Sequence, residues 1–437
     1  MTSLTTRPPN ARRIRSVVAV LALALAAPLV IGATPTPTPT PDPERAAEYW
    51  LEGAHVDAAW KTTRGAGVTI AVIDTGIAKG PSQFDGAVTD GTDVSGIGSD
   101  DGRTPLGPLD SDHGSRVASL AAGRPNADGT GMIGVAPDAK LLSISLGFGA
   151  TAPVPFAKQV AEAMKWAVDH GANVINLSFT TNTLEWDSSW DDAFLYAFEH
   201  DVVVVVAAGN RGSGTAMVGA PATIPGVLAV GGVDQHGVAS KAASTQGISI
   251  AVSAPSESLL GVDANGTIET WNGTSGAAPI VAGVVALVRA AHPDMDANNV
   301  INHIIQTARP APQATAHPDP LYGYGLIDAA AAVSASLPSV DQNPLGDLSD
   351  WIRLNRRAQA PAPAQPTSTP LAIPPLPRAD TPTKATSPLI PSPDSLLYGT
   401  LPLVALTVPG ILIALGVTAA ARRIRSARAS ARQNPDD

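Results

Sequence analysis

Residues 202–210 have the sequence VVVVVAAGN, in which five valines are followed by two alanines, a glycine and an asparagine. Five β-branched residues in a row, without polar alternation, predict a strand that is buried on both faces. Four further apolar runs and four segments of helical periodicity surround it. The runs are Val68–Ile73, Leu141–Ile144, Val174–Leu177 and Val227–Val230, and the helical segments are Phe156–His170, Trp190–His200, Ala277–Ala291 and Ala297–Thr307. This alternation predicts an α/β fold with a mostly parallel sheet and helices on both faces, whose functional residues follow the carboxyl ends of the strands.

The composition excludes several kinds of site. The chain has 437 residues and no cysteine, so disulfides, cysteine-bound metals and a thiol nucleophile are impossible. Residues 34–421 hold 19 basic and 36 acidic side chains, which give a net charge of −17. Such an acidic surface repels phosphate backbones, and we therefore expect no nucleic-acid partner.

Both ends of the chain carry membrane-targeting features. Four arginines precede the uncharged run Val17–Ile31, which predicts a secretory signal peptide over residues 1–33, with an uncleaved anchor as the alternative. Leu396–Ala421 has 26 residues without a charge and predicts one transmembrane helix. Five arginines follow at once, so the positive-inside rule predicts a cytosolic basic tail at residues 422–437. The expected location is the plasma membrane, crossed once, with the larger part of the chain outside.

Two Pro-rich spacers divide the rest of the chain. Residues 34–49 are rich in Thr and Pro and predict an extended spacer. Residues 50–338 contain the predicted strands and helices and are expected to form the folded domain. Residues 339–395 predict a semi-rigid stalk, interrupted by a short amphipathic segment at Leu348–Arg356.

Four polar residues stand beside the predicted strands and helices. Asp74 directly follows the run Val68–Ile73, although an aspartate at a strand end is most often a turn residue. His113 is surrounded by small residues that leave its imidazole room for a partner, whereas a lone histidine is usually structural. Asn210 ends the valine strand, either as a turn residue or as an amide donor to an oxyanion. Ser275 precedes an apolar helix, either as an N-cap or as a nucleophile beside the N–H groups of the helix.

The order of these residues along the chain resembles that of the subtilisin-like serine proteases (subtilases). The motifs that carry the resemblance are IDTG at 73–76, DHG at 112–114, AAGN at 207–210 and NGTSGAAP at 272–279. The resemblance covers about residues 50–338 and implies a serine endopeptidase with a subtilisin-like sheet. It implies that Ser275 attacks the scissile carbonyl, that His113 transfers the proton and that Asp74 orients the imidazole. It also implies that Asn210 stabilises the oxyanion.

The resemblance further implies how a peptide is bound. Subtilases hold the peptide as an extended strand along two backbone segments, which here lie near Leu146–Ala150 and Leu177–Thr180. The implied substrate-binding residues are Leu177, Ser178, Phe179 and Gly209. Three features depart from the pattern of the family, of which Ser115 in place of the more usual threonine is the mildest. Gly276 replaces a bulky residue after the nucleophile, which predicts an open wall beside it, and Phe179-Thr180 replaces glycines, which changes the expected shape of the primary specificity pocket.

The architecture as a whole resembles that of the mycosins, the membrane-anchored proteases of actinobacterial type VII secretion systems. A signal peptide, a Pro-rich spacer, a subtilase domain, a Pro-rich stalk, one span and a basic tail occur in that order. The resemblance implies protein or peptide substrates and membrane components of a secretion system as partners. Two alternatives remain. One is a scaffold in a secretion complex, in which proteolysis is secondary, and the other is a hydrolase of esters or lipids, which shares the triad chemistry but not this order of residues.

No cofactor is expected, and calcium is the one alternative. The segment Asp85–Asp112 is acidic and offers carboxylate oxygens, which are the ligands that calcium prefers. The candidate ligands are Asp90, Asp93, Asp100, Asp101, Asp110 and Asp112. Their spacing is not that of a known calcium loop, and acidic runs of this kind are most often solvated.

Overall fold

A computed structural model describes residues 42–108, 110–149, 152–356, 379–380 and 401–433. The predicted signal peptide lies outside the described residues, as do residues 34–41 of the predicted spacer and most of the predicted stalk.

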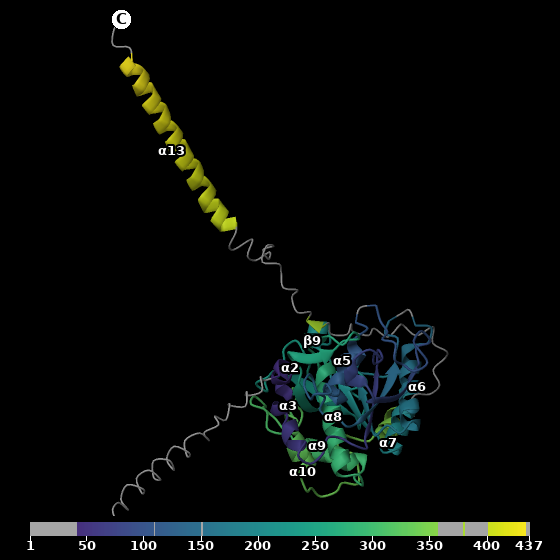
Figure 1. Cartoon of the computed structure of the whole chain (residues 1–437). Coiled ribbons are helices and arrows are strands. Elements are labelled where there is room, and N and C mark those ends of the chain that lie inside the picture. Colours follow the sequence, from purple (N-terminus) through teal and green to yellow (C-terminus); the bar gives the residue numbers. More distant parts are fainter. Residues whose placement is uncertain (1–41, 109, 150–151, 357–378, 381–400, 434–437) are drawn as a thin grey trace, which may run out of the picture. The chain divides into compact units, whose positions relative to one another are not determined.

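A seven-stranded parallel sheet forms the centre of the folded domain (Figure 1). Its strand order is β2-β3-β1-β4-β5-β6-β7, and every pairing in it is parallel. The strands are β1 (Thr69–Asp74), β2 (Val88–Asp93), β3 (Lys140–Ser145), β4 (Val174–Leu177), β5 (Val203–Ala207), β6 (Leu228–Val233) and β7 (Ile250–Pro255). The α/β fold is thus confirmed, and β1, β3, β4, β5 and β6 coincide with the five predicted apolar runs.

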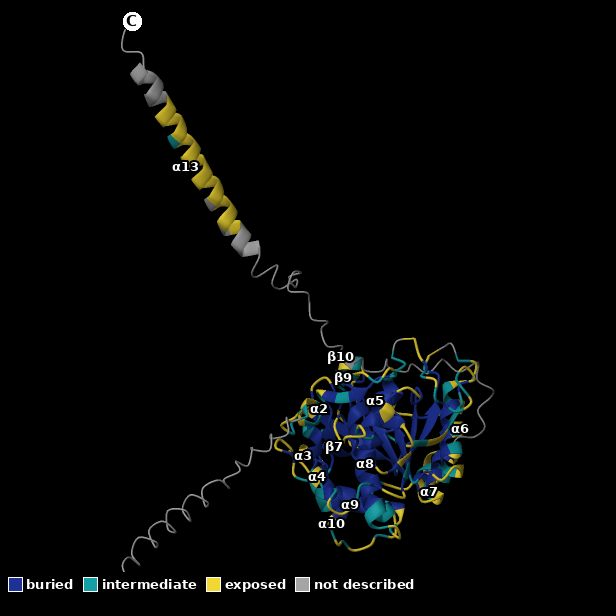
Figure 2. Ribbon diagram, in the orientation of Figure 1, coloured by how far each residue is buried: buried dark blue, intermediate teal, exposed yellow. Residues whose placement is uncertain are grey.

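Successive residues of the central strands enter two separate hydrophobic cores, because side chains alternate between the two faces of a sheet. Val203 and Val205 enter one core, and Val204 and Val206 enter the other. The first core contains α5 (His113–Ala122), α8 (Thr274–Ala291), α9 (Ala297–Gln306) and α10 (Ala329–Ser334); the second contains α6 (Phe156–Asp169) and α7 (Ser189–Glu199). Figure 2 shows how burial concentrates in the sheet and in α8. The valine run is therefore apolar throughout because both of its faces are covered.

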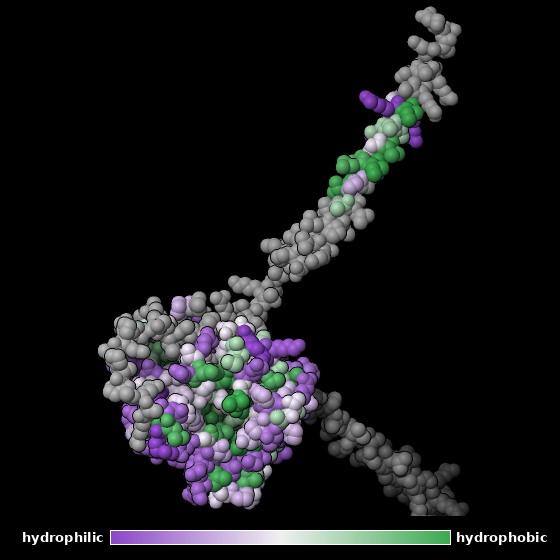
Figure 3. Space-filling view, turned by 180° about the vertical axis from the view of Figure 1, so that it is seen from behind, coloured by the Kyte–Doolittle hydropathy of each residue, from purple (hydrophilic) through white to green (hydrophobic). Residues whose placement is uncertain are grey.

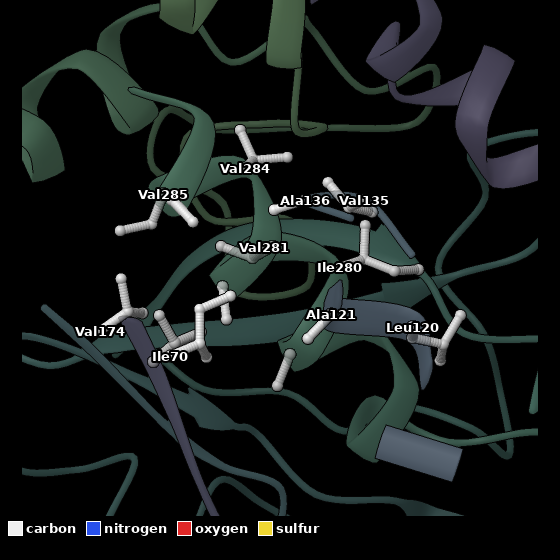
Figure 4. Packing of buried hydrophobic residues seen from close by; sticks show 14 of the residues in the cluster. Ile70, Leu120, Ala121, Val135, Ala136, Val174, Ile280, Val281, Val284 and Val285 are labelled. Carbon is white, nitrogen blue, oxygen red and sulfur yellow. The ribbon is translucent and has the colours of Figure 1, made fainter. Parts of the chain in front are cut away.

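Helix α8 occupies the middle of the first core (Figure 4). Its residues are buried along almost the whole helix, including Ile280 and Val281, which pack among Leu120 of α5 and Val174 of β4. The helix is also long and apolar enough to cross a membrane, but 89% of it is buried inside the protein. Its hydrophobicity therefore serves the core.

The folded domain begins earlier than the predicted boundary at residue 50. Two short helices, α2 (Pro43–Ala47) and α3 (Tyr49–Gly53), lie within or across the end of the predicted spacer, and α4 (Val56–Ala59) follows. The buried carboxylate of Glu48 accepts hydrogen bonds from Arg45 at 2.9 Å and from the backbone N–H of Ile133 at 2.9 Å. The segment from Glu44 to Tyr49 is therefore part of the fold, because its polar and apolar side chains both find partners in the domain.

The folded domain also extends beyond the predicted boundary at residue 338. The amphipathic segment forms α11 (Leu348–Asn355), whose Leu348 is buried. The ring of Trp351 lies 4.3 Å from that of Trp186, and Nε of Arg356 lies 2.6 Å from a carboxylate oxygen of Asp191. The predicted stalk thus does not begin at residue 339, because α11 packs against α7 through these side chains.

A second, antiparallel sheet contains β8 (Leu259–Val262), β9 (Ile268–Trp271) and β10 (Ala379–Asp380). Helix α13 (Leu401–Gln433) follows towards the C-terminus. Its window Thr407–Ser426 has 20 residues with a mean hydropathy of 1.3, and none of it is buried in the protein. Figure 3 shows hydrophobic side chains along the coloured part of α13 and hydrophilic ones at one end of it. Its length and composition are those of a helix that spans a membrane.

Candidate active site

Asp74 and His113 form a buried pair at the carboxyl edge of the sheet. Asp74 is the last residue of β1, and His113 is the first residue of α5. The Nδ1 atom of His113 lies 2.8 Å and 3.0 Å from the two carboxylate oxygens of Asp74. Both side chains are 0% exposed, so this hydrogen bond is shielded from water and fixes the orientation of the ring.

Ser275 lies in the first turn of α8, one residue beyond the start of the helix. Its hydroxyl donates a hydrogen bond of 2.8 Å to the backbone oxygen of Ser178. The hydroxyl of Ser178 donates in turn to the backbone oxygen of Ser275 at 2.9 Å. The structure thus joins the serine to the segment after β4.

The other ring nitrogen of His113 has no hydrogen-bond partner in the described part of the chain, although it is buried. Of the contacts expected within the triad, the structure contains the hydrogen bond between Asp74 and His113, whereas the one between Ser275 and His113 is not made in this conformation. Hydrogen bonds of this type are often long or absent before substrate binds. A change in the side-chain torsion of Ser275 moves its hydroxyl away from Ser178.

Asn210 follows β5, and its side-chain oxygen is held by one neighbouring residue. The oxygen accepts hydrogen bonds from the backbone N–H of Thr274 at 2.8 Å and from its hydroxyl at 3.1 Å. The hydroxyl of Thr274 also accepts the N–H of Gly209 at 3.0 Å. Since the oxygen is engaged, the amide N–H₂ of Asn210 remains to donate to a ligand. Thr274 was missed by the sequence analysis, because nothing in its local pattern indicates this contact.

Trp271 is a second residue that the sequence analysis missed. Its ring is fully buried and meets that of His113 edge to face at 5.7 Å. Arg116 lies over the same indole at 5.4 Å and forms ion pairs with Asp110 and Glu269. Burial raises the pKa of the Glu269 carboxyl, and the guanidinium of Arg116 opposes this rise. The candidate base is thus packed against an aromatic wall.

The expected open wall at Gly276 is not present. A Cβ atom at this position would lie 2.4 Å from a methyl carbon of Leu259 and 3.3 Å from the ring of Trp271. The space that a bulky residue would fill is therefore occupied by side chains of β8 and β9. This could not be predicted, because the contacts of Gly276 depend on how β8 and β9 fold back against the start of α8.

The four expected substrate-binding residues lie at or just after the ends of two neighbouring strands, since Leu177 ends β4. Ser178 and Gly209 contact Ser275 and Thr274, respectively, as described above. The side chain of Leu177 lies in the second core, so only its backbone is available to a ligand. The ring of Phe179 contacts those of two other phenylalanines, Phe148 and Phe156, at 5.8 Å and 5.3 Å.

Two carboxylates of the acidic segment, those of Asp93 and Asp101, have partners other than a metal. Burial would raise the pKa of Asp93, but four hydrogen bonds outweigh it and lower the pKa; they come from Ser95, Ser145, Gly96 and Gly98. The ammonium group of Lys79 lowers the pKa of Asp101 to about 2. Among the described residues, no three histidine or acidic side chains come close enough together to hold a metal ion.

A histidine whose Nδ1 is held by a buried carboxylate, together with a serine at a helix N-terminus, is the set of side chains that a serine hydrolase uses on a parallel sheet. Residues 65–325 match the sequence profile of the Subtilase family, and the chain belongs to this family. It is accordingly a subtilisin-like serine endopeptidase.

Among known proteins, the chain is similar to mycosins. It is 34% identical to Mycosin-4 of Mycobacterium tuberculosis (strain ATCC 25618 / H37Rv) over 339 residues, which cover 68% of this chain and 70% of that protein. The crystal structure of MycP1 with the N-terminal propeptide removed superimposes with a TM-score of 0.57 at 30% identity, covering 67% of this chain and 98% of the other. The MycP3 protease from the type VII (ESX-3) secretion system superimposes with a TM-score of 0.56 at 32% identity, covering 66% of this chain and 88% of the other. The predicted resemblance to mycosins is confirmed.

Proposed function

We propose that Asp74, His113 and Ser275 form a catalytic triad that hydrolyses peptide bonds, and that Asn210 donates to the oxyanion. The observation that carries this proposal is the buried hydrogen bond between Asp74 and Nδ1 of His113. The carboxylate holds the proton on Nδ1, so that Nε2 is free to act as a base.

The reaction begins when the hydroxyl of Ser275 turns from Ser178 to Nε2 of His113. Nε2 then takes the hydroxyl proton while Oγ attacks the carbonyl carbon of the peptide, and His113 passes this proton to the leaving amine. Water repeats the sequence on the acyl ester, which releases the acid and restores the serine. The amide of Asn210 and the N–H groups at the start of α8 stabilise the negative oxygen in both halves.

The test is covalent labelling of the full chain in detergent with a fluorophosphonate, combined with peptide hydrolysis. Ser275→Ala should lose both activities and keep its circular dichroism spectrum. Ser189→Ala, at an exposed serine of α7, is the matched control and should keep both. Labelling that persists in Ser275→Ala would contradict the assignment of the nucleophile.

We also propose that α13 anchors the enzyme in the plasma membrane, with the catalytic domain outside. The apolar window Thr407–Ser426 supports the anchor, and the arginines that end it support a cytosolic C-terminus. An epitope tag placed after Asp437 should bind antibody only in permeabilised cells. Binding to intact cells would overturn the orientation.

A role beside a type VII secretion system is the finer part of the proposal, and similarity to the MycP3 protease from such a system supports it. The substrate is then a protein of the same export machinery. Deletion of the whole chain should stop export of the system's substrates, whereas Ser275→Ala should leave export intact and the target uncleaved. If both strains are blocked alike, catalysis alone explains the requirement, and if both export normally, the partnership is wrong.

A further inference from the structure

The walls of the pocket for the residue before the scissile bond follow from the positions of Ser275 and Asn210. Strands β4 and β5 are neighbours in the sheet, so their continuations, residues 178–181 and 208–210, run on from the same edge. The hydroxyl of Ser275 donates a hydrogen bond to the backbone oxygen of Ser178, in the first of these segments, and Asn210 is the last residue of the second. A peptide whose carbonyl carbon meets Ser275 and whose oxygen meets Asn210 therefore directs the adjoining side chain between these two segments.

The side chains of Thr180 and Thr215 occupy the space between these segments. A Cβ atom built on Gly209 would lie 2.8 Å from the methyl carbon of Thr180 and 2.6 Å from that of Thr215. Real carbon atoms essentially never approach so closely. The two threonine side chains are also buried, at 8% and 1% exposure. The gap beside Gly209 thus lacks room for even one further carbon atom.

Thr180 also meets a third wall of the same space. A Cβ atom on Gly219 would lie 3.1 Å from the hydroxyl oxygen of Thr180. This hydroxyl donates to the backbone oxygens of Thr181 at 3.2 Å and Ala220 at 3.4 Å. Because the hydroxyl is held on that side, the methyl group of Thr180 is fixed towards Gly209.

The two segments beside this space carry almost no charge. Residues 177–183 and 207–223 contain no acidic residue, and their one basic residue is Arg211. Its guanidinium donates instead to the backbone oxygens of Ser240 and Lys241. A charged side chain in this space would therefore lose its hydration without gaining a counter-ion from either segment.

We propose that Thr180 and Thr215 close the primary specificity pocket, so that the enzyme cleaves after glycine, alanine or serine and rejects larger or charged residues. This inference rests on the proposed triad, since Ser275 and Asn210 define where the pocket lies. It names the class of substrate as proteins with an exposed, extended segment of small residues. The threonines determine specificity and take no part in the chemical steps.

The experiment measures hydrolysis by the full chain in detergent of quenched fluorescent peptides that differ only at the residue before the scissile bond. Alanine, leucine, phenylalanine and lysine are compared. We expect kcat/KM for alanine to exceed that for phenylalanine by roughly 100-fold, near the upper limit for discrimination by pocket size. Thr180→Gly, or the milder Thr180→Ser, should lower this ratio by about tenfold or more, chiefly by improving phenylalanine.

Two control variants separate pocket volume from other effects. Thr180→Val keeps the volume and loses the hydroxyl, and it should keep the preference for alanine. Thr183→Gly changes an exposed residue of the same segment and should leave the ratio unchanged. A wild-type enzyme that cleaves after phenylalanine as fast as after alanine would overturn the proposal, as would an unchanged ratio in both Thr180→Gly and Thr180→Ser.

Fluorophosphonate labelling distinguishes failure of the pocket from failure of the triad, because this probe carries no residue for the pocket. Labelling together with unselective cleavage overturns the assignment of Thr180 and Thr215 alone. Absence of labelling overturns the triad and the pocket together.

Discussion

The amide of Asn210 owes its orientation to Thr274, which supplies two of its hydrogen bonds. Removing the amide with Asn210→Ala should reduce kcat by about 10²–10³-fold, because one donor to the oxyanion is lost. Thr274→Val should have a smaller effect on kcat, because its backbone N–H still holds the oxygen of Asn210. The kinetics of peptide hydrolysis measure both effects. A variant that changes KM and leaves kcat unaltered would contradict a role in the transition state.

Asp93 is a second single residue with a measurable effect, because its contribution to stability depends on pH. Its pKa is lowered in the folded state by hydrogen bonds from Ser95, Ser145 and two glycines, which overcome the effect of burial. A lowered pKa means that the stabilisation is complete above the unfolded value of about 3.9 and is lost as the pH falls below it. Asp93→Asn should reduce the free energy of unfolding by about 1–2 kcal/mol at pH 7, allowing for solvent screening at this half-buried site.

Denaturant unfolding of both proteins between pH 7 and pH 3 measures this effect. The difference between them should be constant above pH 5 and should shrink below about pH 4. Asp192→Asn, at an exposed aspartate of α7, is the control and should stay within about 0.5 kcal/mol of the wild type. A difference that grows in acid would contradict the lowered pKa of Asp93.

At the scale of elements, α11 packs against α7 and so holds the end of the folded domain in place. The ring of Trp351 contacts that of Trp186 at a tilt of 40°, and Arg356 lies over both indoles while it pairs with Asp191. Trp351→Ala should lower the free energy of unfolding by about 2–3 kcal/mol, since an aromatic contact and a cation–π contact are both lost. Leu354→Ala, at a residue of the same helix that is 63% exposed, is the matched control and should have almost no effect. Equal effects of the two substitutions on the melting temperature would show that α11 is not held through its tryptophan.

The strands that could be predicted from the sequence are those with a mostly apolar run of four or more residues. The strand β5 was found because both of its faces are buried, which leaves five valines in a row. The strands β2, β7, β8 and β9 were not predicted, because glycine, serine, threonine or acidic residues interrupt the apolar run in each of them. Helices α2 and α3 were missed because they adjoin a Thr-Pro repeat, whose composition dominates the local pattern.

The same reasoning applies to the candidate site. Asp74, His113, Asn210 and Ser275 could be found because each is embedded in a short motif of small residues. Trp271 and Thr274 could not, because a contact with His113 or Asn210 is visible only when distant elements are brought together. The resting hydrogen bond of Ser275 to Ser178 likewise depends on a side-chain torsion, which no residue pattern specifies.

At the scale of the whole molecule, α13 should decide whether the enzyme sediments with membranes. A chain truncated after residue 395 lacks this helix and should be recovered in the soluble fraction with its peptidase activity intact, because the two cores and α11 lie before it. The full chain should remain with the membrane after washing at high salt and be released by detergent. A truncated chain that still sediments with membranes would show that other residues hold the protein there.

The buried position of α8 has a consequence for how the chain is exported. On the proposed topology, the chain threads through a translocation channel unfolded, and α8 enters the channel before α13 does. Its mean hydropathy is 1.5, against 1.3 for the window in α13, so hydropathy alone would stop translocation at the wrong helix. The clearest difference is in the basic residues at the end of each segment, because five arginines lie between residues 422 and 432, whereas the first segment has only Arg289 near its end and no further basic residue before Arg309. Arginines placed directly after Ala291 would therefore be expected to strand the unfinished enzyme across the bilayer, with its nucleophile separated from its base.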